Sequence, residues 1–267
     1  MTAMREASSV KSAAALHHVP VWVGMATIAG VSWLYLGRMG EGMAGMGGGA
    51  SAHAGMAMGD AGAQSLVTAF VMWAAMMMAM MLPTVAPTAA LYSGLAARRD
   101  PQRGARRTSL YVGGYAMPWI AFAAAAALAQ WTLTHFMLLD PMARSTSSLL
   151  SAAILLAAGA YQWLPFKRAC LSKCRTPLAF FMAKWRDGPF GAFVVGLQHG
   201  GYCVACCWAL MAVMFVVGAM SLAWMGLFML LVLGEKLIPA RWRFDQAIGV
   251  TFVVSGLWIA ARAWSGT

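Results

Sequence analysis

Acidic residues are scarce in this chain of 267 residues, which has 8 Asp and Glu against 19 Lys and Arg. Charged residues make up only 10% of the sequence, and the carboxylates fall in expected loops or at the ends of apolar segments. Mg²⁺, Ca²⁺ and Mn²⁺ prefer oxygen ligands, so we expect no site for these ions within the apolar segments. The chain also lacks a glycine-rich phosphate loop, a nucleophile elbow and a carboxylate pair, which argues against active pumping and acid–base catalysis.

Hydrophobic residues make up 61% of the chain, and its mean hydropathy is +0.68. Crossing the hydrocarbon core of a bilayer takes about 20 apolar residues in a helix. Runs near this length lie at 19–36, 65–92, 109–135, 145–164, 191–218, 221–237 and 247–264. The sequence therefore predicts an all-α, polytopic bundle of about seven transmembrane helices. Because the run at 221–237 is short and directly follows its predecessor, six helices with one re-entrant segment are the alternative.

The basic residues support this arrangement, because Lys and Arg are retained on the cytoplasmic side of a membrane. With a cytoplasmic N-terminus, most of the 19 fall in inner segments, and only Arg38, Arg144 and Arg262 lie outside. We expect a multi-pass protein of the bacterial inner membrane. Since the charge follows topology and does not gather on one face, it indicates contact with the lipid bilayer and no nucleic-acid partner.

Four regions are predicted from these patterns. They are a cytoplasmic arm at 1–18, a first transmembrane helix at 19–37, a periplasmic loop at 38–64, and a six-helix membrane core with basic cytoplasmic loops at 65–264. The loop is rich in Gly and Ala and contains soft metal donors, which include Met43, Met46, His53, Met56 and Met58. Such a flexible segment is predicted to capture Cu(I), although a degenerate linker is the alternative.

The stretch "HGGYCVACCW" places His199, Cys203, Cys206 and Cys207 on one helical face about 100° wide. His199 and Cys207 are about 12 Å apart along the axis, so they cannot share one ion, whereas donors one turn apart can. Thiolates and thioethers favour Cu(I), with Zn²⁺ as the alternative when thiolates dominate. Two other interpretations stay open, namely packing cysteines and thiol redox chemistry at the C-x-x-C spacing.

Two further groups of soft donors accompany this stretch. The apolar run at 65–92 has methionines expected at the depth of the thiols, namely Met72, Met76, Met77, Met80 and Met81. They are predicted to complete the ligand set, with ordinary helix packing as the alternative. On the inner side, Cys170 and Cys174 are one turn apart among basic residues, and they are predicted to form an exit or docking site for copper unless they are unligated.

Four blocks of the sequence carry a resemblance to a known family. They are "MWAAMMMAMMLPTVAP", "YQWLPFKRACLSKCRTPLAFF", "GLQHGGYCVACCWALMAVMFVVGAM" and "LVLGEKLIP". Together they resemble a prokaryotic family of predicted metal-binding integral membrane proteins, a domain of unknown function sometimes labelled copper chaperone, over about 65–239. The resemblance implies a multi-helix bacterial membrane protein whose metal site uses the cysteines, His199 and the methionines of these blocks.

The hypothesis from the sequence is a non-enzymatic membrane protein that binds Cu(I) through Cys, Met and His. It would pass the copper ion to a copper-dependent membrane or periplasmic enzyme, or to a soluble copper carrier. A membrane thiol-disulfide oxidoreductase using Cys203 and Cys206 is the enzymatic alternative. A non-catalytic accessory subunit of a membrane complex is the third hypothesis.

Overall fold

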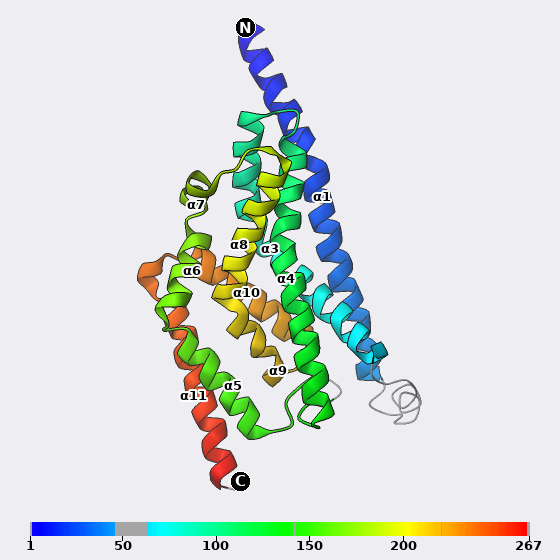
Figure 1. Cartoon of the computed structure of the whole chain (residues 1–267), viewed down its shortest axis with the longest axis vertical. Coiled ribbons are helices and arrows are strands. Elements are labelled where there is room, and N and C mark those ends of the chain that lie inside the picture. The colour runs from blue at the N-terminus through cyan, green and yellow to red at the C-terminus, as the bar shows by residue number, and fades with distance from the viewer. Residues whose placement is uncertain (1, 46–62, 141–142, 220, 266–267) are drawn as a thin grey trace.

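The computed structural model describes residues 2–45, 63–140, 143–219 and 221–265, and these fold into a bundle of helices without a named strand (Figure 1). In chain order the helices are α1 (Thr2–Gly45), α3 (Ala63–Arg99), α4 (Gly104–His135), α5 (Ser148–Tyr161), α6 (Pro165–Arg175), α7 (Pro177–Lys184), α8 (Gly188–Ala212), α9 (Met214–Val217), α10 (Leu222–Leu237), the 3₁₀ helix η1 (Ala240–Trp242) and α11 (Phe244–Ser265). The all-helical prediction is confirmed for these residues.

Five segments of the described chain are long and apolar enough to cross a membrane. They are Val19–Gly40, Leu66–Arg99, Gly104–His135, Gly188–Val217 and Ala240–Ser265. The expected span at 145–164 is instead α5, which joins α6 through a bend of 65°, and this pair would make a sixth. The expected span at 221–237 is α10, which has only 16 residues. By length and composition the described chain thus offers five or six spans, and seven stays a prediction.

The first helix is longer than expected at both ends. It begins at Thr2, within the expected arm, and continues to Gly45, and α3 begins at Ala63. Met43 therefore lies in α1, although its side chain is outside the description. Met46, His53, Met56 and Met58 fall in 46–62, outside the described residues, so the predicted capture loop stays a prediction.

Proline within α3 creates a contact that ties this helix to α1. Pro83 has no N–H, so it cannot donate to the carbonyl of Ala79 four residues earlier. The indole of Trp33 in α1 donates to that carbonyl instead, at 3.1 Å. Helices in hydrocarbon tolerate proline only when a neighbour satisfies the freed carbonyl, and Trp33 does so here.

Glycines allow α4 and α8 to approach unusually closely. A Cβ atom at Gly196 would lie 2.0 Å from the carbonyl oxygen of Tyr111, and one at Gly200 would lie 2.5 Å from that of Tyr115. On α4, a Cβ at Gly114 would lie 2.1 Å from the carbonyl of Phe193. The Gly196-x-x-x-Gly200 spacing places both glycines on one helix face, the small-residue arrangement by which membrane helices pack backbone to backbone. Tyrosines of α4 are consequently held against α8.

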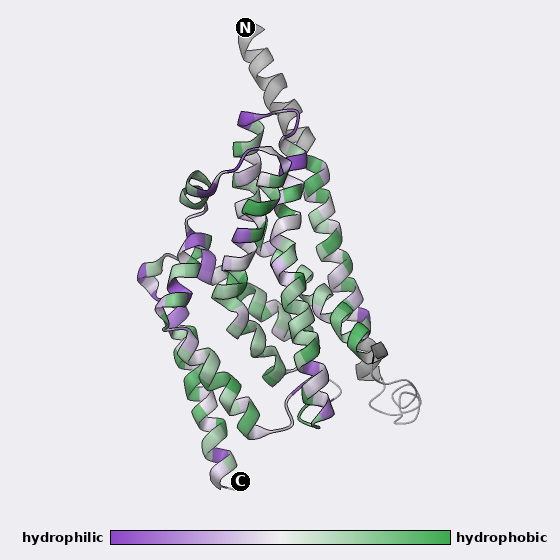
Figure 2. Cartoon of the chain, in the orientation of Figure 1, coloured by the Kyte–Doolittle hydropathy of each residue, from purple (hydrophilic) through white to green (hydrophobic). Residues whose placement is uncertain are grey.

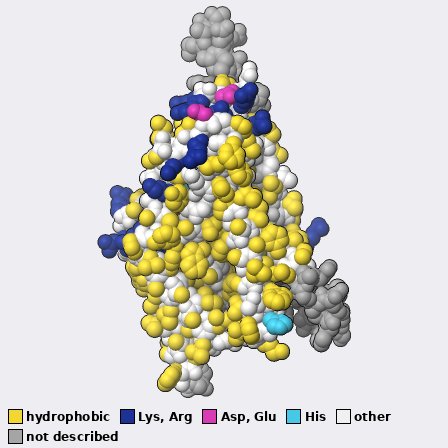
Figure 3. Space-filling view, viewed as in Figure 1, with side chains coloured by type: hydrophobic (Ala, Val, Ile, Leu, Met, Phe, Trp, Pro, Cys, Tyr) yellow, Lys and Arg dark blue, Asp and Glu magenta, His cyan; other side chains and the backbone are white. Residues whose placement is uncertain are grey.

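Polar and apolar surfaces are separated along the bundle. The start of α1, the turn between α3 and α4 and the start of α8 lie at one end, whereas α11 ends at the opposite one (Figure 1). Hydrophilic residues concentrate at the first end and around α6 (Figure 2), and Lys and Arg cover the same end and one edge of the face in Figure 3. Large apolar side chains are exposed elsewhere, among them Val254, Leu257 and Trp258 on α11. Such an apolar exterior is typical of lipid-facing helices.

Candidate metal centre

Two helices supply the thiols at the centre of the bundle. Cys203 and Cys206 are three residues apart on α8, so they project from one face of that helix. Cys174 lies in the last turn of α6, a short helix that begins with Pro165 and packs against α8. Because α6 turns 65° from the direction of α5, its last turn enters the region beside α8.

The sulfur atoms of Cys174, Cys203 and Cys206 all lie within 4.8 Å of one another, and all three residues are buried. A metal–sulfur bond of about 2.3 Å, as in zinc thiolates, requires sulfurs about 4.0 Å apart in a trigonal site and about 4.6 Å apart in a linear one. The upper limit of 4.8 Å on the sulfur–sulfur distances is close to both values. The three thiols can therefore hold one soft metal ion.

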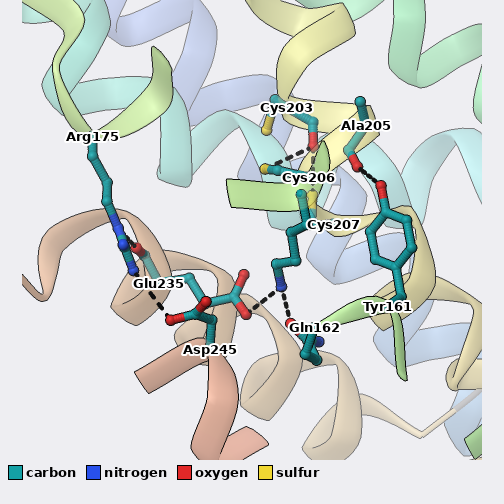
Figure 4. A network of polar contacts seen from close by, with 10 residues as sticks. Tyr161, Gln162, Arg175, Cys203, Ala205, Cys206, Cys207, Glu235 and Asp245 are labelled. Atoms are coloured by element: carbon teal, nitrogen blue, oxygen red, sulfur yellow. Dashed lines mark hydrogen bonds and ion pairs between the residues drawn. The ribbon is translucent and has the colours of Figure 1, made fainter. Parts of the chain in front are cut away.

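Hydrogen bonds fix the positions of the α8 thiols. Cys206 donates from Sγ to the Cys203 carbonyl at 3.2 Å, and Cys207 donates to the same carbonyl at 2.8 Å (Figure 4). A hydrogen bond of 3.2 Å joins the hydroxyl of Tyr115 to Cys203 Sγ. Partners of this kind orient a metal ligand, and their loss typically weakens metal binding by about 10–100-fold. Tyr115 thus connects the close α4–α8 packing to the thiol cluster.

His199 lies one turn before Cys203 in a cage of aromatic rings. Its Nδ1 shares a hydrogen bond of 2.6 Å with the hydroxyl of Tyr111. Tyr115 and Phe180 also pack near the imidazole, with ring centroids 5.4 and 5.6 Å away. Nε2 is buried and has no hydrogen-bond partner in the described part of the chain. The imidazole is outside the group of three thiols, so it can serve only as a neighbouring donor.

The other predicted ligands of α3, α6 and α8 lie in the same buried core as the three thiols. Cys170 is 5% exposed and lies one turn before Cys174, and Cys207 is fully buried. The methionines of α3 that were predicted as ligands are each at most 1% exposed, namely Met72, Met76, Met77, Met80 and Met81. Helix α6 packs more closely against α8 than α3 does. Thioether coordination stays a prediction.

Buried ion pairs lie between α6, α10 and α11. Lys167 forms an ion pair of 2.6 Å with Glu235 and donates to the side chain of Gln162. Arg175 donates to the Glu235 carbonyl at 2.7 Å and approaches Asp245 at 3.9 Å (Figure 4). From the sequence, Lys167 and Glu235 were placed in inner loops or at helix ends. Both lie near helix ends, and both side chains are buried, with Lys167 0% and Glu235 1% exposed.

A second buried lysine lies near Tyr115, the hydrogen-bond partner of Cys203. Lys236, in the last turn of α10, is 9% exposed and donates to the Thr84 hydroxyl at 3.0 Å. Its ammonium lies 6.0 Å from the ring centroid of Tyr115. Thr84 also contacts the sulfur of Met81 at 3.8 Å, which connects the methionine helix to this region.

Sequence reasoning missed Tyr115, Thr84 and Lys236 as neighbours of the thiols. One signal for Lys236 was available, since "LVLGEKLIP" places two charges against an apolar run, where ionisable residues are expensive and mark functional sites. The glycine spacing at 196 and 200 was the corresponding signal for a tight helix contact. Neither pattern identifies which helix lies opposite.

The fold and the centre define an all-helical protein with a buried cluster of cysteines that can bind a soft metal. A family model described as a copper chaperone, PpoB2, matches residues 70–259. The match covers most of the chain, including every helix that contributes to the centre, and the chain belongs to this copper chaperone family. The matched region begins after the predicted Met/His-rich loop. Neither curated proteins nor solved structures give a match.

Proposed function

We propose that the protein is a multi-pass membrane copper chaperone that holds Cu(I) between α6 and α8. The observation that carries this proposal is the meeting of Cys174 with Cys203 and Cys206 in the buried core. Membership of the copper chaperone family supports the metal, and the donor set supports its oxidation state. Three thiols without a carboxylate suit Cu(I), which accepts two or three soft ligands, better than Zn²⁺, which usually takes four.

Transfer of the ion is proposed to proceed by ligand exchange along α8. His199 is four residues, or about 6 Å, from Cys203 towards the start of α8, and its Nε2 is the donor proposed for exchange on the cytoplasmic side of the thiols. Met81, whose sulfur lies 3.8 Å from the Thr84 hydroxyl that Lys236 contacts, is the thioether proposed to assist. The recipient is proposed to be a copper-dependent membrane or periplasmic enzyme, or a soluble copper carrier.

The location proposed for the protein is the bacterial inner membrane with a cytoplasmic N-terminus. The candidate spans of the described chain support insertion. The basic residues at the end of the bundle that contains the start of α1 support this orientation, because such residues stay in the cytoplasm (Figure 3).

The proposal is tested by titrating detergent-solubilised protein with Cu(I) under anaerobic conditions against a chromogenic Cu(I) chelator. We expect one tightly bound Cu(I) per chain. Cys174→Ser should weaken binding by more than the roughly 10–100-fold caused by losing an outer hydrogen-bonding partner, because it removes a ligand. Cys170→Ser, one turn earlier on the same helix, should retain the ion. Equal behaviour of the two variants would contradict the site.

The same preparation separates the alternatives. The close approach of Cys174 to Cys203 and Cys206 also suits a disulfide, so reversible formation of that bond in protein that binds no copper would favour a thiol-disulfide oxidoreductase. If the protein neither binds copper nor forms that disulfide, and it co-purifies stably with a larger complex, the accessory-subunit hypothesis is favoured.

A further inference from the structure

The buried charges beside the thiols form pairs, with one exception. Lys167 is neutralised by Glu235, and Arg175 approaches Asp245. Lys236 makes no ion pair with a carboxylate of the described chain, and its hydrogen-bond partner is the neutral hydroxyl of Thr84. Among the buried charged side chains of the described residues, Lys236 is therefore the one without a partner of opposite charge.

A buried charge without a partner of opposite charge costs free energy. Within a membrane, ionisable side chains are therefore rare unless such a partner is present. The Lys236 ammonium lies 6.0 Å from the ring centroid of Tyr115, and the Tyr115 hydroxyl shares a hydrogen bond of 3.2 Å with Cys203 Sγ. Tyr115 thus contacts both this cation and a thiol of the centre. We therefore expect the negative charge that balances Lys236 to form at the metal site.

We propose that Lys236 is the fixed counter-charge for Cu(I) bound to two thiolates, an assignment that rests on the proposed function. Two S–H bonds break when the ion binds, two Cu–S bonds form, and two protons leave to the solvent. One Cu(I) and two thiolates have a net charge of −1, which the Lys236 ammonium cancels. Cys174 is one of the two thiolates and a cysteine of α8 is the other, so the remaining thiol of α8 is available as an incoming ligand for exchange.

The charge of Lys236 and its packing between helices can be tested separately. If Lys236 served only to hold α10 against α3 through Thr84, removing the hydrogen bond or the charge would destabilise the metal-free protein in the same way. If it is the counter-charge, the metal-free protein tolerates a neutral side chain, because an unpaired buried cation disappears, while copper binding weakens. The two roles therefore predict opposite patterns of stability and affinity.

The experiment compares Lys236→Met, Thr84→Val and Lys173→Met in the full-length protein, using Cu(I) affinity and thermal unfolding of the metal-free form. Lys173 is an exposed lysine beside Cys174 and serves as the matched control. We expect Lys236→Met to weaken Cu(I) binding roughly ten-fold or more, the usual effect of one nearby charge, without lowering the unfolding temperature. Thr84→Val and Lys173→Met should keep an affinity near that of the wild type.

Two results would overturn the assignment. One is wild-type Cu(I) affinity in Lys236→Met. The other is an equal loss of affinity in Thr84→Val, which keeps the charge and removes only the hydrogen bond. Should Lys236→Met fail to fold, Lys236→Arg retains the charge and must then bind Cu(I), or the assignment fails. Wild-type protein that binds no Cu(I) would instead refute the proposed function itself.

Discussion

The glycine contact between α4 and α8 allows a sharp comparison of two neighbouring substitutions. In Gly196→Ala the new methyl group would lie 2.0 Å from the carbonyl oxygen of Tyr111, whereas a carbon and an oxygen normally stay about 3.3 Å apart. The obstacle is helix backbone, so the two helices must separate by about 1 Å. Gly201→Ala is the matched control, because a Cβ there meets nothing within 4 Å.

The expected magnitude follows from the contacts that such a separation removes. Overpacking a tight interface costs about 1–3 kcal/mol. The hydrogen bonds from Tyr111 to His199 and from Tyr115 to Cys203, now 2.6 and 3.2 Å, would lengthen, and each contributes about 0.5–1.5 kcal/mol. Gly201→Ala should be neutral or stabilise by up to about 1 kcal/mol, since alanine favours a helix. We expect the two variants to differ by about 3 kcal/mol or more.

The measurement is reversible unfolding of both variants in the same mixed micelles, followed by circular dichroism. For a chain of this size the difference corresponds to an unfolding temperature lower by about 6 °C or more in Gly196→Ala. Equal unfolding temperatures for the two variants would refute the close contact between α4 and α8. It would also remove the basis for placing Tyr115 against Cys203.

Two further predictions concern buried polar contacts. Trp33→Phe should destabilise the protein by about 0.5–1.5 kcal/mol by leaving the Ala79 carbonyl without a donor. The same change should have almost no effect in a Pro83→Ala background, where the helix regains its own donor, and equal losses in both backgrounds would contradict this account. Lys167→Met should cost about 3–5 kcal/mol because it strands the Glu235 carboxylate, and Lys167→Met combined with Glu235→Leu should recover most of that loss. A double variant as unstable as the single one would show that the ion pair does not act as a unit.

Patterns local in the sequence predicted part of this molecule. The spacing of Cys203 and Cys206 placed them on one face of a helix, and α8 confirms that helix. The family resemblance is likewise confirmed by the copper chaperone match. These features depend on residues close together in the chain, whose relative positions are set by helix geometry alone.

The identity of the neighbouring helix could not be predicted in the same way. Depth in the membrane suggested methionines of the second run as partners for the thiols, which stays a prediction, and depth alone does not give the order of helices around a bundle. The bend of 65° after α5 brings Cys174 to the centre, and nothing in the apolar pattern marks that bend. Lys167 and Glu235 are 68 residues apart, and a charge count contains no information about their pairing.

The origin of the three thiols in two separate helices has a mechanical consequence. An ion bound by Cys174 on α6 and by α8 is a cross-link, so its binding free energy adds to the work needed to pull α6 from α8. Ion binding and separation of α6 from α8 oppose each other. A recipient that docks on α6 and draws this helix away from α8 therefore lowers the affinity for the ion. Such a recipient could receive the metal ion without having stronger ligands. Transfer would then be selective for a protein that can displace α6.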